Sequence, residues 1–214
     1  TIFTLGAVYA ATMNFTIFEI SLFIFLITVA GAIFQWPIGY FSDRTDRRII
    51  IIACTFIGAF FCFLTVTASG TSLQNMYLAT SVGMDKIMFF VFVTLYAGFA
   101  IPIFTLNLAY VNDFIAKEKF VAAGAGMQII FGLGAMGGPI FCSIFMNFYG
   151  SNGFFVFLGI FHLIIGLFGM YRITKRAYED NPESTFTPLP RNITPLGIEL
   201  DPTTGADISS TDKK

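Results

Sequence analysis

Long, continuous runs of apolar residues dominate the chain, and apolar and polar positions do not alternate within them. A helix that crosses a bilayer requires about 20 consecutive apolar residues. Five runs meet this length without containing Asp, Glu, Lys or Arg: residues 20–41, 49–69, 87–111, 120–147 and 153–171. Membrane strands alternate in polarity and are about half as long. The runs therefore predict membrane-spanning α-helices, in which backbone polar groups bond within the segment.

A sixth apolar run, residues 1–13, is too short to cross a bilayer. Because the chain starts at Thr1 rather than at Met, we interpret this run as the end of a partial helix and expect a piece of a longer protein. The run lacks the basic leading segment of a secretory signal peptide. We predict an all-α integral membrane bundle over residues 1–171.

Composition excludes an ordinary soluble domain. The chain is 56% hydrophobic and only 12% charged, and it contains 28 phenylalanines, whereas a soluble domain carries about 25% charged residues. No cluster of polar or nucleophilic residues at catalytic spacing occurs in the apolar runs, so we predict that the protein is not an enzyme. Cys54, Cys62 and Cys142 lack metal-ligand spacing, and we expect no metal or cofactor. The lone His162 is interpreted as a packed, neutral side chain.

The basic residues are distributed unequally over the connecting segments. If alternate segments lie on opposite sides, then 42–48, 112–119 and 172–214 share one side, and 14–19, 70–86 and 148–152 share the other. Eleven of the twelve Lys and Arg residues fall on the first side, and only Lys86 falls on the second. Short basic segments next to membrane helices stay cytoplasmic. We therefore predict that the first side is cytoplasmic and that the protein is a multi-pass membrane protein; the family resemblance given below implies the bacterial inner membrane.

Residues 172–214 differ from the rest of the chain. This segment holds five of the eight prolines and seven of the thirteen acidic residues. The prolines exclude a long helix. We predict a mostly disordered cytoplasmic tail.

One short stretch, GYFSDRTDRR at residues 39–48, places two acids and three arginines between two apolar runs. We call it the charged decapeptide. Gly39 permits close approach of a neighbouring helix, and Asp46 stands where the next helix begins and can bond its free N–H groups. Asp43 lies close to arginines that form planar paired bonds with carboxylates. The candidate gating residues are Gly39, Asp43, Arg44, Asp46, Arg47 and Arg48.

The charged decapeptide matches every fixed position of the loop signature of the major facilitator superfamily, and the chain resembles that family over nearly its whole length. The resemblance implies a twelve-helix transporter made of two six-helix halves, in which the signature follows the second helix of the amino half and a related copy follows the eighth helix. It also implies that Asp43 caps a helix across the interface between the halves, with Arg47 bonding nearby, to stabilise the outward-open state.

The resemblance favours the carboxyl half. The amino half usually carries a membrane-embedded Arg in the second span after the signature, and the run 87–111 has no charge. Two further stretches, LAYVNDFI at 108–115 and FTPLPRNITPLGIELDP at 186–202, resemble the YcaD-type branch of bacterial facilitators. We therefore expect the end of helix seven through helix twelve, with a missing amino-terminal half as partner.

Uncharged polar residues near the predicted cytoplasmic edge are candidates for a substrate pathway. Gln35, Asn107 and Gln128 lie six to nine residues from a charged residue at that edge. At about 1.5 Å per residue they stand at a similar depth of about 9–14 Å. Trp36 and Tyr96 are candidate aromatic walls. The alternative is bonding between helices, worth about 0.6–2 kcal/mol each.

The function predicted by these features is secondary active transport of a small solute by alternating access. Two alternatives stay open: a non-transporting membrane sensor or scaffold with the same fold, and an amino-half fragment of an antiporter. The expected partners are the lipid bilayer, the missing half and a small-molecule substrate, with no nucleic acid.

Overall fold

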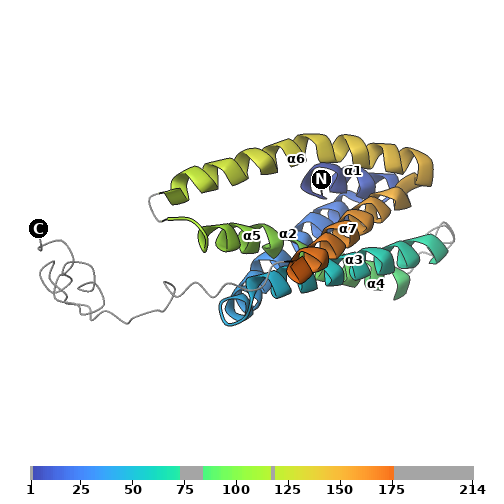
Figure 1. The fold of residues 1–214 in the computed structure, drawn as a ribbon. Helices are drawn as coiled ribbons and strands as arrows, with labels where there is room; N and C mark the ends of the chain where they lie inside the picture. Colours follow the sequence, from blue (N-terminus) through green and yellow to red (C-terminus); the bar gives the residue numbers. More distant parts are fainter. Residues whose placement is uncertain (1, 73–83, 117–118, 176–214) are drawn as a thin grey trace, which may run out of the picture. The chain divides into compact units, whose positions relative to one another are not determined.

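In the computed structural model the described residues, 2–72, 84–116 and 119–175, form helices joined by short turns (Figure 1). Those from position 176 onward lie outside the described part, and the predicted disordered tail falls almost entirely on them. The helices are α1 (Ile2–Thr12), α2 (Ile17–Ser42), α3 (Arg47–Ser72), α4 (Met84–Ala100), α5 (Pro102–Asn112), α6 (Phe120–Tyr149), the 3-10 turn η3 (Gly150–Asn152) and α7 (Gly153–Lys175).

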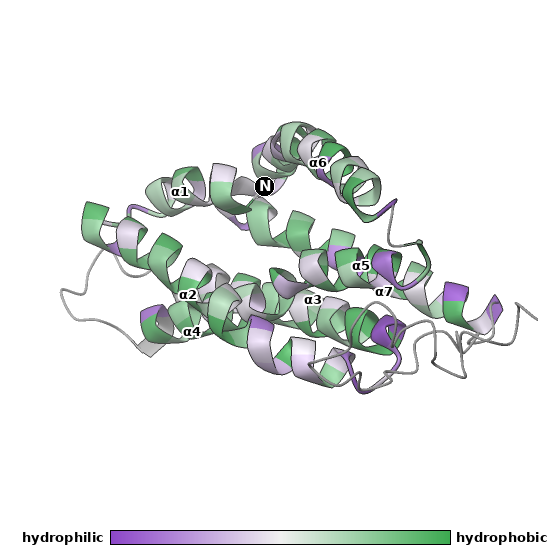
Figure 2. Cartoon of the chain, turned by 90° about the vertical axis from the view of Figure 1, so that its left-hand side faces the viewer, coloured by the Kyte–Doolittle hydropathy of each residue, from purple (hydrophilic) through white to green (hydrophobic). Residues whose placement is uncertain are grey.

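Four stretches of the described residues are helical, long and apolar enough to cross a membrane: Ile17–Ser42, Arg47–Ser69, Lys86–Asn112 and Phe120–Lys175. The last stretch contains both α6 and α7. Hydrophobic colours cover most of these helices in Figure 2. The prediction of an all-helical protein with membrane-spanning segments is therefore confirmed at this level.

Helix α2 begins three residues before the predicted span because its first turn is capped. The Thr16 hydroxyl accepts from the Glu19 backbone N–H at 3.3 Å, and the Glu19 carboxylate accepts from the Thr16 N–H at 2.8 Å. This reciprocal pair satisfies two backbone donors that a helix start leaves free. A charged residue can therefore stand inside the first turn of a membrane helix.

The predicted span 87–111 lies in one helical stretch, Lys86–Asn112, in which the hydrogen-bond pattern changes locally at Pro102. Helix α4 ends at Ala100 and α5 starts at Pro102. Proline has no N–H to continue the hydrogen-bond pattern, and its ring crowds the carbonyl four residues earlier. Pro37 and Pro139 lie inside α2 and α6 without ending them.

Ile101, at this break, packs against α2 at a glycine. A Cβ atom built on Gly31 would lie 2.6 Å from Ile101 Cδ1, so only glycine leaves room for this side chain. Helix α2 also packs along α4, and α3 packs against both α4 and α7. Ile101, between α4 and α5, therefore packs in the space that the missing side chain of Gly31 leaves on α2.

The turns gather at two opposite ends of the helices. At one end Arg47, which opens α3, contacts Asp113, which follows α5. Gly169, near the end of α7, packs on Ile52 at this same end of α3. At the other end, the Ser69 hydroxyl donates to Asn152 Oδ1 at 2.7 Å. The described turns of the two sets that sequence alternation separates therefore lie at different ends of the bundle.

The core lies toward the end opposite the charged decapeptide and is aromatic. Tyr9 stacks on Phe154 with ring centroids 4.9 Å apart and meets Phe155 edge-on at 5.1 Å. Phe23 and Phe89 are fully buried beside them. In lipid such packing stabilises a bundle through close van der Waals contact rather than through exclusion of water.

Candidate functional site

The charged decapeptide forms the turn between α2 and α3, and Asp46 organises its second half. One carboxylate oxygen of Asp46 accepts from the Arg48 backbone N–H at 2.9 Å, and the other accepts from Arg48 Nη2 at 2.8 Å. Asp46 thus satisfies a free donor at the start of α3 and neutralises an arginine. The predicted capping by Asp46 is confirmed.

These bonds set the charge state of Asp46. Burial alone would raise the pKa of this carboxyl, but the bonds from the Arg48 side chain and backbone and the Arg48 charge outweigh it. The pKa of Asp46 is therefore lower than that of an ordinary aspartate. Its carboxylate is ionised at neutral pH and holds the turn closed.

A pH dependence follows from the lowered pKa of Asp46. Its contribution to stability is complete above the ordinary aspartate pKa of about 3.9 and is lost as pH falls through the lower folded value. At pH 7 we expect Asp46→Asn to lower the free energy of unfolding by about 1 kcal/mol. This difference should shrink toward zero in strong acid. Thermal unfolding of the parent and the variant at pH 7 and in strong acid measures this difference in stability. A difference that grows in acid would contradict the lowered pKa of Asp46.

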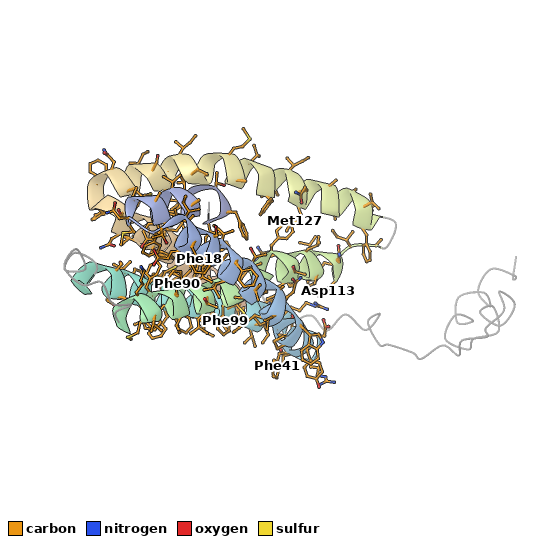
Figure 3. The ribbon with its side chains drawn as sticks, turned by 180° about the vertical axis from the view of Figure 1, so that it is seen from behind. Phe18, Phe41, Phe90, Phe99, Asp113 and Met127 are labelled. Carbon is orange, nitrogen blue, oxygen red and sulfur yellow. The ribbon has the colours of Figure 1, made fainter. Side chains whose placement is uncertain are left out.

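Arg47 bridges two carboxylates from different parts of the chain. Its Nη2 lies 2.9 Å from Asp43 Oδ1, and its Nε lies 2.8 Å from Asp113 Oδ2. A planar guanidinium presents donors on separate edges, so one side chain can hold both acids. We call this arrangement the Arg47 bridge. It links the end of α2, the start of α3 and the end of α5, which carries the labelled Asp113 in Figure 3.

Asp113 is the member of the Arg47 bridge that sequence reasoning did not identify. In the sequence it marked the edge of a span and stood within the stretch 108–115, and nothing local shows what an isolated acid will contact. The structure gives it a partner 66 positions away, Arg47. The only available signal was that both residues end spans on the same predicted side.

The first half of the charged decapeptide is more exposed than the second half. The Asp43 side chain is 65% exposed although it contacts Arg47. The Arg44 guanidinium stacks on the Tyr40 ring at 3.6 Å from its centroid. Gly39 was expected to admit a neighbouring helix, but in the described part of the chain no atom lies within 4 Å of a Cβ built there. The close approach predicted at Gly39 is therefore not made by these helices.

The five pathway candidates do not form one cluster. Gln35 donates from Nε2 to Thr105 Oγ1 at 3.0 Å and so joins α2 to α5. Asn107 donates to the Ile103 carbonyl on its own helix at 2.9 Å. Trp36 is 78% exposed on α2, and Gln128 is exposed on α6.

Tyr96, the second proposed wall, lies in the core and is 3% exposed. Its ring meets His162 edge-on with centroids 5.5 Å apart. His162 Nδ1 lies 2.8 Å from the Leu158 carbonyl, which can only accept, so this nitrogen carries the proton. His162 is thus packed as expected, and Tyr96 packs beside it.

Cys54, Cys62 and Cys142 are buried and free. Within the described ranges no group of His, Cys, Asp and Glu side chains is placed to hold a metal ion. The charged decapeptide makes ion pairs and hydrogen bonds between helix ends.

In a comparison with protein families, residues 1–203 of the chain match the Major Facilitator Superfamily. The match covers almost the whole chain and includes the charged decapeptide. This chain belongs to the major facilitator superfamily of membrane transport proteins.

Curated relatives agree with this membership. The chain is 25% identical over 152 residues to the uncharacterized MFS-type transporter YfkF of Bacillus subtilis, covering 71% of this chain and 35% of that protein. It is 25% identical over 133 residues to the uncharacterized MFS-type transporter YE1530 of Yersinia enterocolitica, covering 62% and 30%. The chain thus spans about a third of the length of the relatives it matches. No solved structure matches it.

Proposed function

We propose that this chain is the carboxyl half of a secondary transporter that moves a small solute across the bacterial inner membrane by alternating access. The proposal extends the family membership with the lack of charge in residues 87–111 and with the resemblance to the YcaD-type branch. The charged decapeptide and the tail would then face the cytoplasm, in agreement with the distribution of Lys and Arg. The missing amino half is the expected partner.

The observation that carries the proposal is the geometry of Asp43. Arg47 holds this carboxylate at 2.9 Å, yet 65% of the side chain stays exposed. Gly39, one helical turn earlier, has open space beside it. An anchored, exposed anion next to a side-chain-free surface is suited to cap a helix end from the other half. Breaking and remaking that contact would accompany each transport cycle.

Gln35 and Asn107 remain the polar candidates for the inner part of the pathway. Gln35 is exposed and carries a second N–H donor besides the one given to Thr105. Trp36 beside it offers an exposed aromatic face. In a two-half transporter the substrate site lies near the bilayer midplane between the halves. Tyr96 would support such a pathway from the core.

Asp43→Asn in the full-length protein tests the proposal. The substitution removes the charge and keeps the shape, so we expect solute uptake into proteoliposomes to fall at least about tenfold, the loss of one charge-assisted contact. The solute is first found by screening a panel of uncharged and amphipathic small molecules. Thr45→Ala is the matched control, because Thr45 lies in the same turn, carries no charge, and donates to the Phe41 carbonyl at 2.8 Å.

Two results would count against the proposal. Full solute uptake with Asp43→Asn would exclude the gating role of Asp43, while the proposed transport activity would be supported. Absence of flux for every solute, with tail-dependent binding of a protein partner, would favour the sensor or scaffold alternative.

A further inference from the structure

A groove lies between α2 and α4 at the end of the bundle opposite the charged decapeptide. Its volume is ≈ 720 Å³, within the range of cavities that hold small ligands, about 300–1,000 Å³. Phe18 and Phe90, both labelled in Figure 3, come from its two walls. The lining residues are Thr16, Phe18, Glu19, Leu22, Leu26, Lys86, Ile87, Phe90, Val91, Thr94 and Leu95.

The charges of the groove stand together at one end of it. Lys86 Nζ pairs with Glu19 Oε1, and these side chains are 16% and 20% exposed. Both residues lie in the first turns of their helices, α2 and α4. A charged pair at the ends of two membrane helices stands at the level of lipid headgroups.

The rest of the groove is apolar and extends one leaflet deep. Leu26 follows Glu19 by seven residues and Leu95 follows Lys86 by nine, which at about 1.5 Å per residue gives depths of about 10 and 13 Å. The hydrocarbon core is about 30 Å thick, so one leaflet takes about 15 Å. The Thr94 hydroxyl, the polar group deepest in the groove, donates to the Phe90 carbonyl at 2.6 Å. A ligand there meets a hydrocarbon surface.

We propose that this groove binds a phospholipid, with one acyl chain between α2 and α4 and the headgroup at Glu19 and Lys86. An ammonium has three N–H donors, so Lys86 can keep Glu19 and also donate to a phosphate oxygen. The Glu19 carboxylate can accept a further N–H besides those from Lys86 and Thr16. Paired opposite charges fit a zwitterionic headgroup whose ammonium can donate, as in phosphatidylethanolamine.

The location favours a lipid over a transported solute. Solute sites of such transporters lie near the midplane, whereas this groove opens at the interface and ends within one leaflet. Ile87 and Val91 line it and are about half exposed, which suits side chains in contact with hydrocarbon. The bound lipid would hold α2 and α4 together. This assignment requires only a membrane protein and does not depend on transport.

Photo-crosslinking tests the proposal in the full-length protein held in lipid nanodiscs. The probe is phosphatidylethanolamine with a photoreactive group in the middle of one acyl chain, and labelled peptides are identified by mass spectrometry. We expect labelling to concentrate on residues 22–26 and 91–95. Lys86→Gln should reduce this labelling about fivefold, as expected for the loss of one hydrogen bond to a phosphate oxygen. Lys86→Arg should retain it.

A second variant leaves the ion pair untouched. Leu26→Trp fills the groove and should reduce labelling without removing any charge. The matched controls are Lys175→Gln, a basic residue at the other end of the bundle, and Ile164→Trp, an exposed position on α7. Neither should change groove labelling. If residues 22–26 and 91–95 were labelled no more strongly than the exposed surface around Ile164, the proposal would be overturned. It would also be overturned if neither Lys86→Gln nor Leu26→Trp changed the labelling of the groove. A phosphatidylcholine probe with the same photoreactive chain tests the headgroup, because its quaternary ammonium has no N–H to donate. Equal labelling by this second probe would overturn the headgroup assignment.

Discussion

Gly153→Ala is expected to distort the turn between α6 and α7 and to lower the stability of the protein. A Cβ on Gly153 would lie 2.6 Å from the Phe145 carbonyl carbon and 2.8 Å from Met146 Cα, with the Phe145 carbonyl oxygen closer still. These are backbone atoms of α6, which cannot move aside as the end of a side chain can. Overpacking of this kind costs about 1–3 kcal/mol, occasionally more. We expect the upper end here, seen as a lower unfolding temperature and loss of monodisperse protein.

Gly132→Ala on α6 is the matched control. In the described part of the chain no atom lies within 4 Å of a Cβ built at Gly132. Alanine is a better helix former than glycine by about 1 kcal/mol, so this variant should be as stable as the parent or slightly more stable. If the Gly153 variant unfolded at the same temperature as this control, the close packing at the turn would be wrong.

Arg47→Ala should free the end of α5 from the turn between α2 and α3. The substitution removes both ion pairs of the Arg47 bridge. Because the carboxylates are 65% and 46% exposed, the loss of stability should stay within about 1 kcal/mol for each pair. The larger effect is on the position of the end of α5 relative to the turn between α2 and α3. Spin labels at Thr45 and Phe114 should show a longer and broader distance distribution.

Arg48→Ala supplies the control for that measurement. Arg48 pairs with Asp46 inside the turn, so its loss should disturb α3 locally and leave the distance between labels unchanged. Asp113→Asn should reproduce the Arg47→Ala result, since it removes the contact that crosses to α5. An unchanged distribution in the Arg47 variant would show that other contacts position α5.

The helical, membrane-spanning character could be predicted because it depends on local composition. Continuous apolar runs leave few alternatives once backbone hydrogen bonds must close within each segment. The capping by Asp46 was predictable for the same reason, since an acid just before a helix bonds the nearest free N–H groups. The predicted apolar span begins at residue 20, and α2 extends three residues further back because bonds between Glu19 and Thr16 cap its first turn.

The remaining features depend on contacts between distant parts of the chain. The run 87–111 looks uniform, yet Pro102 divides it into two assigned helices, while Pro37 and Pro139 lie inside α2 and α6. The partner of Asp113 follows from the packing of α3 against α5, and the burial of Tyr96 follows from the packing of α4 against α3 and of α3 against α7. The pathway candidates were chosen by depth alone, and depth does not determine which side of a helix a residue occupies. Gln35 meets Thr105, while Asn107 bonds its own helix.

Pro102 weakens the helical stretch that runs from α4 into α5 at one point, because proline has no N–H to donate to the carbonyl four residues earlier. Membrane helices bend most easily where such a bond is absent. Ile101 packs against Gly31 beside this point, and the Asp113–Arg47 contact lies at the far end of α5. A bend at Pro102 would therefore act on that ion pair from a distance.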